Sequence, residues 1–246
     1  MNPPNPSLRA YQERFLAEVK GRLPLEGATI LEVGSAEGAL AHALAGAGAA
    51  RVVGIDKAGP GEPTGSSSDR VRLIRMDAHQ LQFADGEFDL AVSLATLEHV
   101  ADPALVLAEI HRVLRPGGLL FARFAPIWTF ATGHHYQVWL QDPEAHVPVW
   151  GHLYWDRKGL FDFLAERHGA DAATRAVEYI YSSNEINRLP CRDYLRLFER
   201  VPFAHREVTP LVSEGFRPFL ERTKGRLRGY DEGELLVAGF AVMMRK

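Results

Sequence analysis

The stretch Ala28-Thr-Ile-Leu-Glu-Val-Gly-Ser-Ala-Glu-Gly38 decides the fold. It opens with a short, mostly apolar run that meets Gly34, which predicts a buried strand followed by a turn. After Gly38 the pattern becomes helical, because apolar residues recur on one face at Leu40, Ala43, Leu44 and Ala47. A strand, a loop of small residues and a helix, in this order, are typical of an α/β fold that binds a ligand at its first turn.

The alternation of strands and helices continues on both sides of this stretch. Before it, Ser7 can cap a helix that ends near Leu23. After it, Asp102-Pro103 predicts a helix start, and Pro116-Gly117-Gly118 predicts its end. Further strands are expected at residues 51–56, 71–76, 88–93, 119–124, 207–213 and 235–244. We therefore predict one α/β domain over residues 1–246, with a doubly wound, mostly parallel sheet of seven strands and an N-terminal cover helix in residues 1–24.

Residues 125–201 break this regularity. This stretch is rich in aromatic residues and histidines, and it contains all four tryptophans: Trp128, Trp139, Trp150 and Trp155. It follows the fifth strand, so we interpret it as an insertion that forms a lid on the substrate side, over the carboxyl ends of the strands. Large aromatic side chains pack the insertion or line an acceptor pocket, and the sequence leaves both roles open.

Composition excludes several classes of protein. The 246 residues carry a formal net charge of −3 and no long Lys/Arg run, which argues against a nucleic-acid partner. Cys191 is the only cysteine, so no intrachain disulfide can form, and we expect it to be an ordinary side chain. No stretch has the length of a membrane span and the N-terminus has no signal pattern, so we expect a cytoplasmic protein. The oligomeric state stays open, a homodimer included.

The charges around the first loop indicate which nucleotide it binds. Glu32 precedes the loop and Glu37 lies within it, and two acids would repel the pyrophosphate of a dinucleotide. Ala36 also stands where the dinucleotide fingerprint has its middle glycine. The same acids favour S-adenosylmethionine (SAM), which has an ammonium and a sulfonium. Asp56, at the end of the next strand, is placed to hold a ribose diol. Asp77 and the N–H of Ala78 follow the third strand, where they suit adenine.

Several motifs together resemble the class I SAM-dependent methyltransferases, in the small-molecule branch that includes ubiquinone- and menaquinone-type methylases. The resemblance covers about residues 25–124 and the final strand. Its motifs are Glu32–Gly38, Gly54-Ile-Asp56, Asp77-Ala78, Phe88–Ser93, Leu97-Glu-His-Val100 and Arg112–Gly118. Ala36 departs from the family, which usually has glycine there.

The resemblance implies that the last strand runs antiparallel, and it implies roles for individual residues. Glu32 would orient the methionine amine, and Asp56 and Asp77 would hold the ribose and the adenine. The methionine part would be lined by Gly34, Ser35, Ala36 and Gly38. Lys57 and His79 would flank the nucleoside, and Ser93 and Leu94 would lie near the sulfonium.

Three histidines are candidate catalytic residues: His134, His135 and His99. A histidine with a near-neutral pKa suits removal of a proton from an acceptor hydroxyl. Alternatively, His134 and His135 only hold the lid by hydrogen bonds, and His99 only shapes the cofactor pocket. A metal site would have to gather His134, His135, Asp142, Glu144, His146 and His152. Because this spacing is not that of a structural zinc site and no Cys pair is present, we predict no metal.

We therefore predict an enzyme that transfers the methyl group of SAM to a small-molecule acceptor, at oxygen rather than at nitrogen or carbon. Two alternatives stay open at this point: an NAD(P)-dependent oxidoreductase, and a non-catalytic SAM-binding module that regulates a partner. The sequence does not identify the acceptor.

Overall fold

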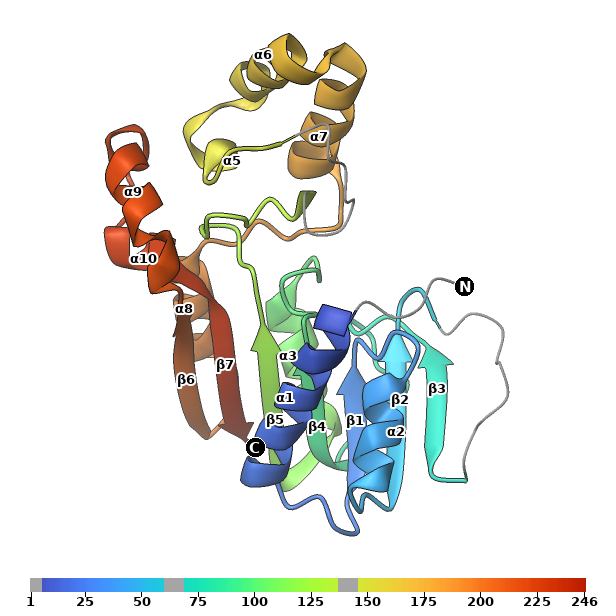
Figure 1. Cartoon of the computed structure of the whole chain (residues 1–246). Coiled ribbons are helices and arrows are strands. Elements are labelled where there is room, and N and C mark those ends of the chain that lie inside the picture. Colours follow the sequence, from blue (N-terminus) through green and yellow to red (C-terminus); the bar gives the residue numbers. More distant parts are fainter. Residues whose placement is uncertain (1–5, 60–68, 137–145) are drawn as a thin grey trace.

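The computed structural model describes residues 6–59, 69–136 and 146–246, and the described strands form one sheet in the order β3-β2-β1-β4-β5-β7-β6 (Figure 1). The strands are β1 (Thr29–Val33), β2 (Arg51–Asp56), β3 (Val71–Arg75), β4 (Phe88–Leu94), β5 (Leu114–Phe124), β6 (His205–Val212) and β7 (Val237–Arg245). Strands β1 to β5 pair in parallel, and β7 runs antiparallel between β5 and β6. The predicted doubly wound, seven-stranded sheet with a reversed last strand is confirmed.

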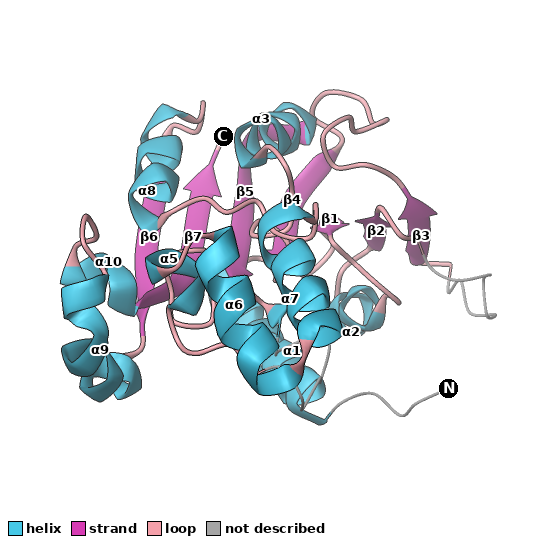
Figure 2. Ribbon diagram, turned by 90° about the horizontal axis from the view of Figure 1, so that it is seen from above, coloured by secondary structure: helices cyan, strands magenta, loops and turns pink. Residues whose placement is uncertain are grey.

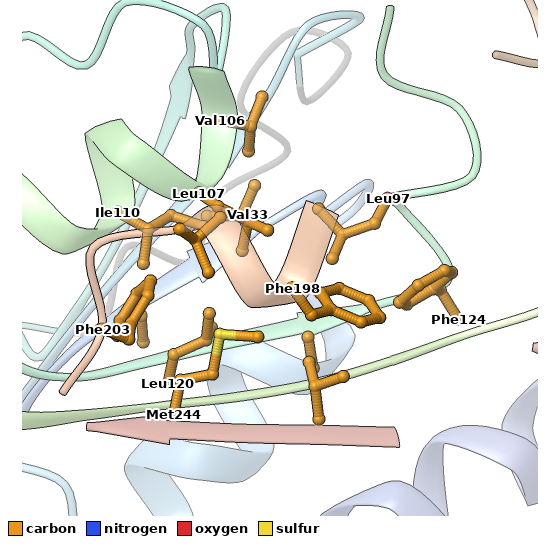
Figure 3. Close-up of a cluster of buried hydrophobic side chains, with 14 of the residues drawn as sticks. Val33, Leu97, Val106, Leu107, Ile110, Leu120, Phe124, Phe198, Phe203 and Met244 are labelled. Carbon is orange, nitrogen blue, oxygen red and sulfur yellow. The ribbon is translucent and has the colours of Figure 1, made fainter. Parts of the chain in front are cut away.

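Helices cover both faces of this sheet (Figure 2). One face carries α1 (Pro6–Arg22) and α2 (Ala39–Gly46), and the other carries α3 (Pro103–Val113) and α8 (Cys191–Arg200). On the second face, Ile110 of α3 and Phe198 of α8 pack against Leu120 of β5 and Met244 of β7 (Figure 3). On the first face, Phe15 of α1 stacks on Phe121 of β5 with ring centroids 5.3 Å apart.

Several element ends differ from the expected ones; β7, for example, begins at Val237, because Leu235 and Leu236 belong to the preceding helix. Helix α1 begins at Pro6, one residue before the expected start at Ser7. Helix α3 ends at Val113, and β5 already begins at Leu114, so Pro116-Gly117-Gly118 belong to the strand. The pairing of β4 with β5 shifts register between Phe88 and Leu90, and this irregularity lets the strand accommodate the glycines. The predicted cap at Asp102 is confirmed, because its carboxylate accepts the N–H of Leu105 at 3.0 Å.

The segment after β5 forms a separate layer beyond the carboxyl ends of the parallel strands (Figure 1). It contains α5 (Gly151–Tyr154), α6 (Arg157–His168) and α7 (Ala170–Ser182), and we call these helices with their connections the lid. The lid has its own apolar cluster, which includes Leu160, Leu164 and Ile180. Within the expected insertion at 125–201, α8 packs in the core of the sheet instead of in this layer.

A second excursion, which was not expected from the sequence, lies between β6 and β7. It contains the short helices η1 (Glu214–Phe216), α9 (Arg217–Thr223), η2 (Lys224–Arg226) and α10 (Glu232–Leu236). Its apolar residues Leu220 and Leu235 pack with Trp150 and Phe130 of the lid region. The lid is therefore supported from two sides, by the sheet and by this excursion.

Candidate functional site

The loop after β1 is anchored on the end of β2. The backbone N–H groups of Gly34 and Ser35 both donate to the carbonyl of Ile55 at 2.9 Å. The N–H of Ala36 donates to a carboxylate oxygen of Asp56, also at 2.9 Å. Successive loop amides are the groups that cradle a phosphate, and here they are already used inside the protein. This geometry supports the earlier electrostatic argument against a pyrophosphate.

Glu32 lies under this loop with its carboxyl group almost completely buried. It accepts one backbone N–H, from Ala41 of α2, and its second oxygen has no hydrogen-bond partner among the described residues. Burial raises the pKa of Glu32 to about 8, with a smaller contribution from the negative charge of Asp56. The buried hydroxyl of Ser35 also lacks a partner in the described structure. Such orphaned polar atoms indicate a place for a polar ligand.

The loop after β1 has two unusual backbone positions, which allow a ligand to approach its backbone closely. Gly34 has φ +83°, and a Cβ atom there would overlap the side chain of Thr96. Ala36 has φ +46°, in the left-handed region that favours glycine. Thr96 belongs to the loop after β4 and was missed in the sequence, although small polar residues in a strand-end loop are a general signal of function. The loops after β1 and β4 therefore touch at Gly34.

Two carboxylates at the same edge of the sheet are fixed by backbone and side-chain donors. Asp56 accepts the N–H of Ala58 at 2.9 Å in addition to that of Ala36. One oxygen of Asp77 accepts both the N–H of His79 at 3.0 Å and its ring Nδ1 at 2.6 Å, and these bonds lower the pKa of Asp77. The other oxygen lies 3.9 Å from the exposed ammonium of Lys57.

His79 therefore positions Asp77. Since its Nδ1 donates to Asp77, its Nε2 is the acceptor, and Nε2 accepts the N–H of Asp102 at 3.1 Å. This chain of bonds ties the end of β3 to the start of α3. Ala78 follows Asp77 directly and is only partly buried.

Ser93 and Leu94 lie at the end of β4, where the sequence placed them. The hydroxyl of Ser93 is buried and donates to the carbonyl of Val33 at 2.9 Å, so it joins β4 to β1. The carbonyl of Leu94 accepts the hydroxyl of Thr96 at 3.0 Å. Both residues border the loop crevice, but the Ser93 side chain already has a structural partner.

Comparison with known proteins agrees with this geometry. Residues 31–122 match the model of a methyltransferase domain. The chain is 35% identical over 115 residues to a ubiquinone biosynthesis O-methyltransferase of Agrobacterium fabrum, which is 45% of this chain and 46% of that protein. Residues 31–122 therefore form a methyltransferase domain. The chain spans about half the length of the curated relatives it matches.

Solved structures show the same fold over nearly the whole chain. A SAM-dependent methyltransferase from Mesorhizobium loti superimposes with a TM-score of 0.54 at 18% identity, covering 94% of this chain and 96% of that one. A protein from Listeria monocytogenes described as a SAM-dependent methyltransferase gives a TM-score of 0.58 at 15% identity, covering 97% and 99%. Because these identities are low, the likeness shows the fold alone.

The first-turn residues of this methyltransferase domain suit SAM, the cofactor of the family. Glu32 offers a buried, unpartnered carboxyl oxygen to a cationic group, and the Ser35 hydroxyl is a second unpartnered group in the same loop. Asp56 and Asp77 are held ready as acceptors for hydroxyl and amine donors. The residues present therefore fit the cofactor.

The predicted catalytic histidines separate into two pairs. His99 and His135 form one pair, with ring centroids 4.9 Å apart and edge-to-face geometry. Nδ1 of His99 donates to the carbonyl of Glu185 at 2.5 Å, and Nε2 of His135 donates to the carbonyl of Pro126 at 2.7 Å. Burial lowers the pKa of both, that of His135 to about 4. Of this pair, only His99 is partly exposed.

His134 belongs to the second pair, inside the lid region. It is fully buried, and its ring lies 5.1 Å from that of His152. Its Nδ1 accepts the N–H of Tyr136 at 3.2 Å, and Nε2 of His152 donates to the carbonyl of Trp128 at 2.7 Å. Burial lowers the pKa of both histidines, that of His152 to about 4. Adjacent in sequence, His134 and His135 thus face different neighbours.

Two predicted roles of the lid residues can be examined in the structure. Trp150 is fully buried in the apolar cluster, and Trp128 and Trp155 are only partly buried. Trp139, Asp142 and Glu144 lie outside the described residues. Within residues 6–59, 69–136 and 146–246, no group of three or more His, Cys, Asp or Glu side chains is arranged to hold a metal ion.

In that same part of the chain, no helix combines the length and apolar character needed to cross a membrane.

Glu98, which precedes His99 in the motif Leu97-Glu-His-Val100, is a further buried polar group of this turn. One of its oxygens accepts the N–H of Ala125 at 3.2 Å, and burial raises its pKa to about 8. Tyr11 of α1 lies within electrostatic reach of Glu98, and its hydroxyl bonds with Arg123 of β5. The N-terminal helix therefore approaches the same end of the sheet as His99.

Proposed function

We propose that this protein transfers the methyl group of SAM to a hydroxyl oxygen of a small-molecule acceptor held between the sheet edge and the lid. The observation that carries the proposal is the buried, unpartnered oxygen of Glu32 beneath a loop whose amides are already bonded. This combination favours a cationic amino-acid nucleoside over a pyrophosphate. It is the physical reason to set aside the dinucleotide oxidoreductase.

The cofactor roles follow from the donors and acceptors at the sheet edge. Glu32 orients the ammonium of the methionine part, while Asp56 accepts from the ribose hydroxyls. The oxygen of Asp77 that faces Lys57 accepts the adenine amine. The small residues of the loop let the methionine part lie against the backbone, at Gly34, Ser35, Ala36 and Gly38. His79 positions Asp77. The remaining predicted residues border the cofactor: Lys57 and Ala78 at the nucleoside, and Ser93 and Leu94 near the sulfonium.

When bound, SAM supplies a methyl group on a positively charged sulfur. His99 is the best-placed proton acceptor of the three predicted histidines, because it is the one that is partly exposed while His134 and His135 are buried. Its Nδ1 donates to the carbonyl of Glu185, so Nε2 is the acceptor nitrogen of the neutral ring. An acceptor hydroxyl that received this methyl group would have to give up its proton. Nε2 of His99 takes the hydroxyl proton. His135 supports the His99 ring, and His134 stabilises the lid.

Relatives support oxygen as the acceptor atom. Proteins to which this chain is similar are named ubiquinone biosynthesis O-methyltransferase, at 32–38% identity over less than half of this chain. A neutral histidine that accepts a proton also suits a hydroxyl, which must lose its proton on methylation. An aromatic hydroxyl is the acceptor we propose to test first.

Two measurements test this function. Isothermal titration calorimetry with SAM, S-adenosylhomocysteine and NADH should show binding of the first two and none of the third. Incubation with SAM and a series of catechols, each matched by the corresponding aromatic amine, should produce S-adenosylhomocysteine with the catechols. Binding of NADH with no binding of SAM would overturn the proposal. Tight SAM binding with no turnover on either series would favour the non-catalytic alternative.

A further inference from the structure

The turn that contains Glu98 and His99 is where both chain connections of the lid meet the sheet. The outgoing connection touches it through the Ala125 N–H bonded to Glu98, and through the His135 ring against His99. The returning connection, after α7, touches it through the Glu185 carbonyl bonded to His99. One short turn is therefore held by segments that are far apart in the sequence.

Asn187 makes the most extensive contact with this turn. Its side-chain N–H₂ donates to the carbonyls of Leu97 at 2.7 Å and Val100 at 3.1 Å. Its backbone N–H donates to the carbonyl of Glu98 at 3.0 Å. The bonds to Leu97 and Val100 bracket the turn, so one side chain fixes the two residues on either side of Glu98 and His99.

The orientation of Asn187 is itself fixed. Its side-chain oxygen accepts the N–H of Leu189 at 3.1 Å and the hydroxyl of buried Tyr194 at 3.1 Å. The amide nitrogen lies within hydrogen-bond distance of three acceptors, the carbonyls of Leu97 and Val100 and, at 2.8 Å, the hydroxyl of Tyr194, so a donor group is required here. A carboxylate of the same shape would face two carbonyl oxygens instead.

We infer that Asn187 is a positioning residue that holds the turn of residues 97–100 against the returning lid segment and so fixes the hydrogen of His99 on Nδ1. The inference rests on the proposed role of His99 as proton acceptor. The carbonyl of Glu185, two residues before Asn187, can only accept a hydrogen bond, so its position selects the tautomer. Loss of the side-chain bonds of Asn187 leaves only the backbone N–H of residue 187 to hold the turn against the segment that carries this carbonyl.

Nitrogen NMR of the histidine rings tests the inference without a known acceptor. In the protein labelled with ¹⁵N histidine and saturated with S-adenosylhomocysteine, His99 is expected to carry its hydrogen on Nδ1, and His99→Gln assigns the signal. In Asn187→Ala and in the isosteric Asn187→Asp, the signal is expected to shift to the Nε2–H form or to a mixture. Asn184→Ala is the matched control, because Asn184 is exposed on the same segment; it should leave the signal unchanged.

The outcomes separate this inference from the proposed function. S-adenosylhomocysteine affinity should stay within about threefold of wild type in both Asn187 variants, because Glu32, Asp56 and Asp77 lie on other loops. An unchanged Nδ1–H signal for His99 in the folded Asn187→Asp protein would overturn the inference. Failure of wild type to bind S-adenosylhomocysteine would instead defeat the proposed function, and the ring signals recorded without ligand would still decide the role of Asn187.

Discussion

The loop after β1 and the lid both bury titratable side chains, but they bury groups of opposite kind. The loop buries an acid, Glu32, whose pKa is raised to about 8. The lid region buries His152 and His135, whose pKa values are lowered to about 4. These three buried side chains are therefore mostly uncharged near pH 7 when no ligand is bound. The difference is that a bound cation can ionise Glu32, whereas protonation of the histidines would place positive charges close together.

The largest effect should come from the packing of the lid. Trp150→Ala removes a fully buried indole that packs with Phe130 and Leu220 and donates to the carbonyl of Thr129. We expect the free energy of unfolding in urea to fall by about 3–5 kcal/mol. Trp155→Ala is the control and should cost less, because Trp155 is only partly buried. Equal losses in both variants would show that Trp150 has no special role.

The next-largest effect should be on SAM affinity, and it should be confined to the proposed cofactor site. Asp56→Ala removes the acceptor proposed for the ribose and also the partner of the Ala36 and Ala58 amides. We expect the affinity for SAM, measured by calorimetry, to fall on the order of 100-fold. Asp69→Ala changes an exposed acid just before β3 and should leave the affinity unchanged. A change of less than about threefold in Asp56→Ala would contradict the assignment.

The loop after β1 and the lid should change in stability in opposite directions with pH. Because the pKa of Glu32 is raised, its contribution to stability is present below its unfolded value of 4.5 and is lost as pH rises through about 8. Because the pKa of His152 is lowered, its contribution is present above 6.5 and is lost as pH falls towards 4.

Hydrogen exchange, corrected for its intrinsic pH dependence, checks this contrast. The α5–α7 peptides should lose protection at about pH 5, and the β1–α2 peptides at about pH 9. His205→Gln alters an exposed histidine on β6 and should change neither response. Loss of protection in both regions at the same pH would remove the proposed contrast.

The smallest effect concerns the backbone of the loop. Ala36 has a left-handed conformation that costs about 1 kcal/mol for a non-glycine residue, and glycine has an entropic cost of similar size. Ala36→Gly should therefore change the free energy of unfolding by less than about 0.5 kcal/mol. Ala43→Gly, in the interior of α2, should lower it by about 1 kcal/mol. If both glycines cost the same in thermal unfolding, the strain at Ala36 is not relieved.

The contrast between the loop after β1 and the lid also explains which features could be predicted from the sequence. The proposed cofactor site consists of strand ends and the loops that follow them. Glu32, Asp56 and Asp77 could therefore be predicted as cofactor-binding residues from local sequence patterns. The region around His99, in contrast, joins segments that are distant in the sequence. Asn187, for example, bonds to Leu97, which lies 90 residues earlier in the chain. No local pattern marks such a residue. The excursion between β6 and β7 was missed for the same reason, since its short helices are stabilised by packing on Trp150.

The most direct test of the central claim is the proton balance of SAM binding. At pH 7 the buried Glu32 carboxyl is mostly protonated in the empty protein, and an ammonium beside it should release that proton. Calorimetry in buffers with different ionisation enthalpies should show release of about one proton per SAM in wild type and close to none in Glu32→Gln. Equal proton release by both proteins, or wild-type binding with no proton released, would contradict the account.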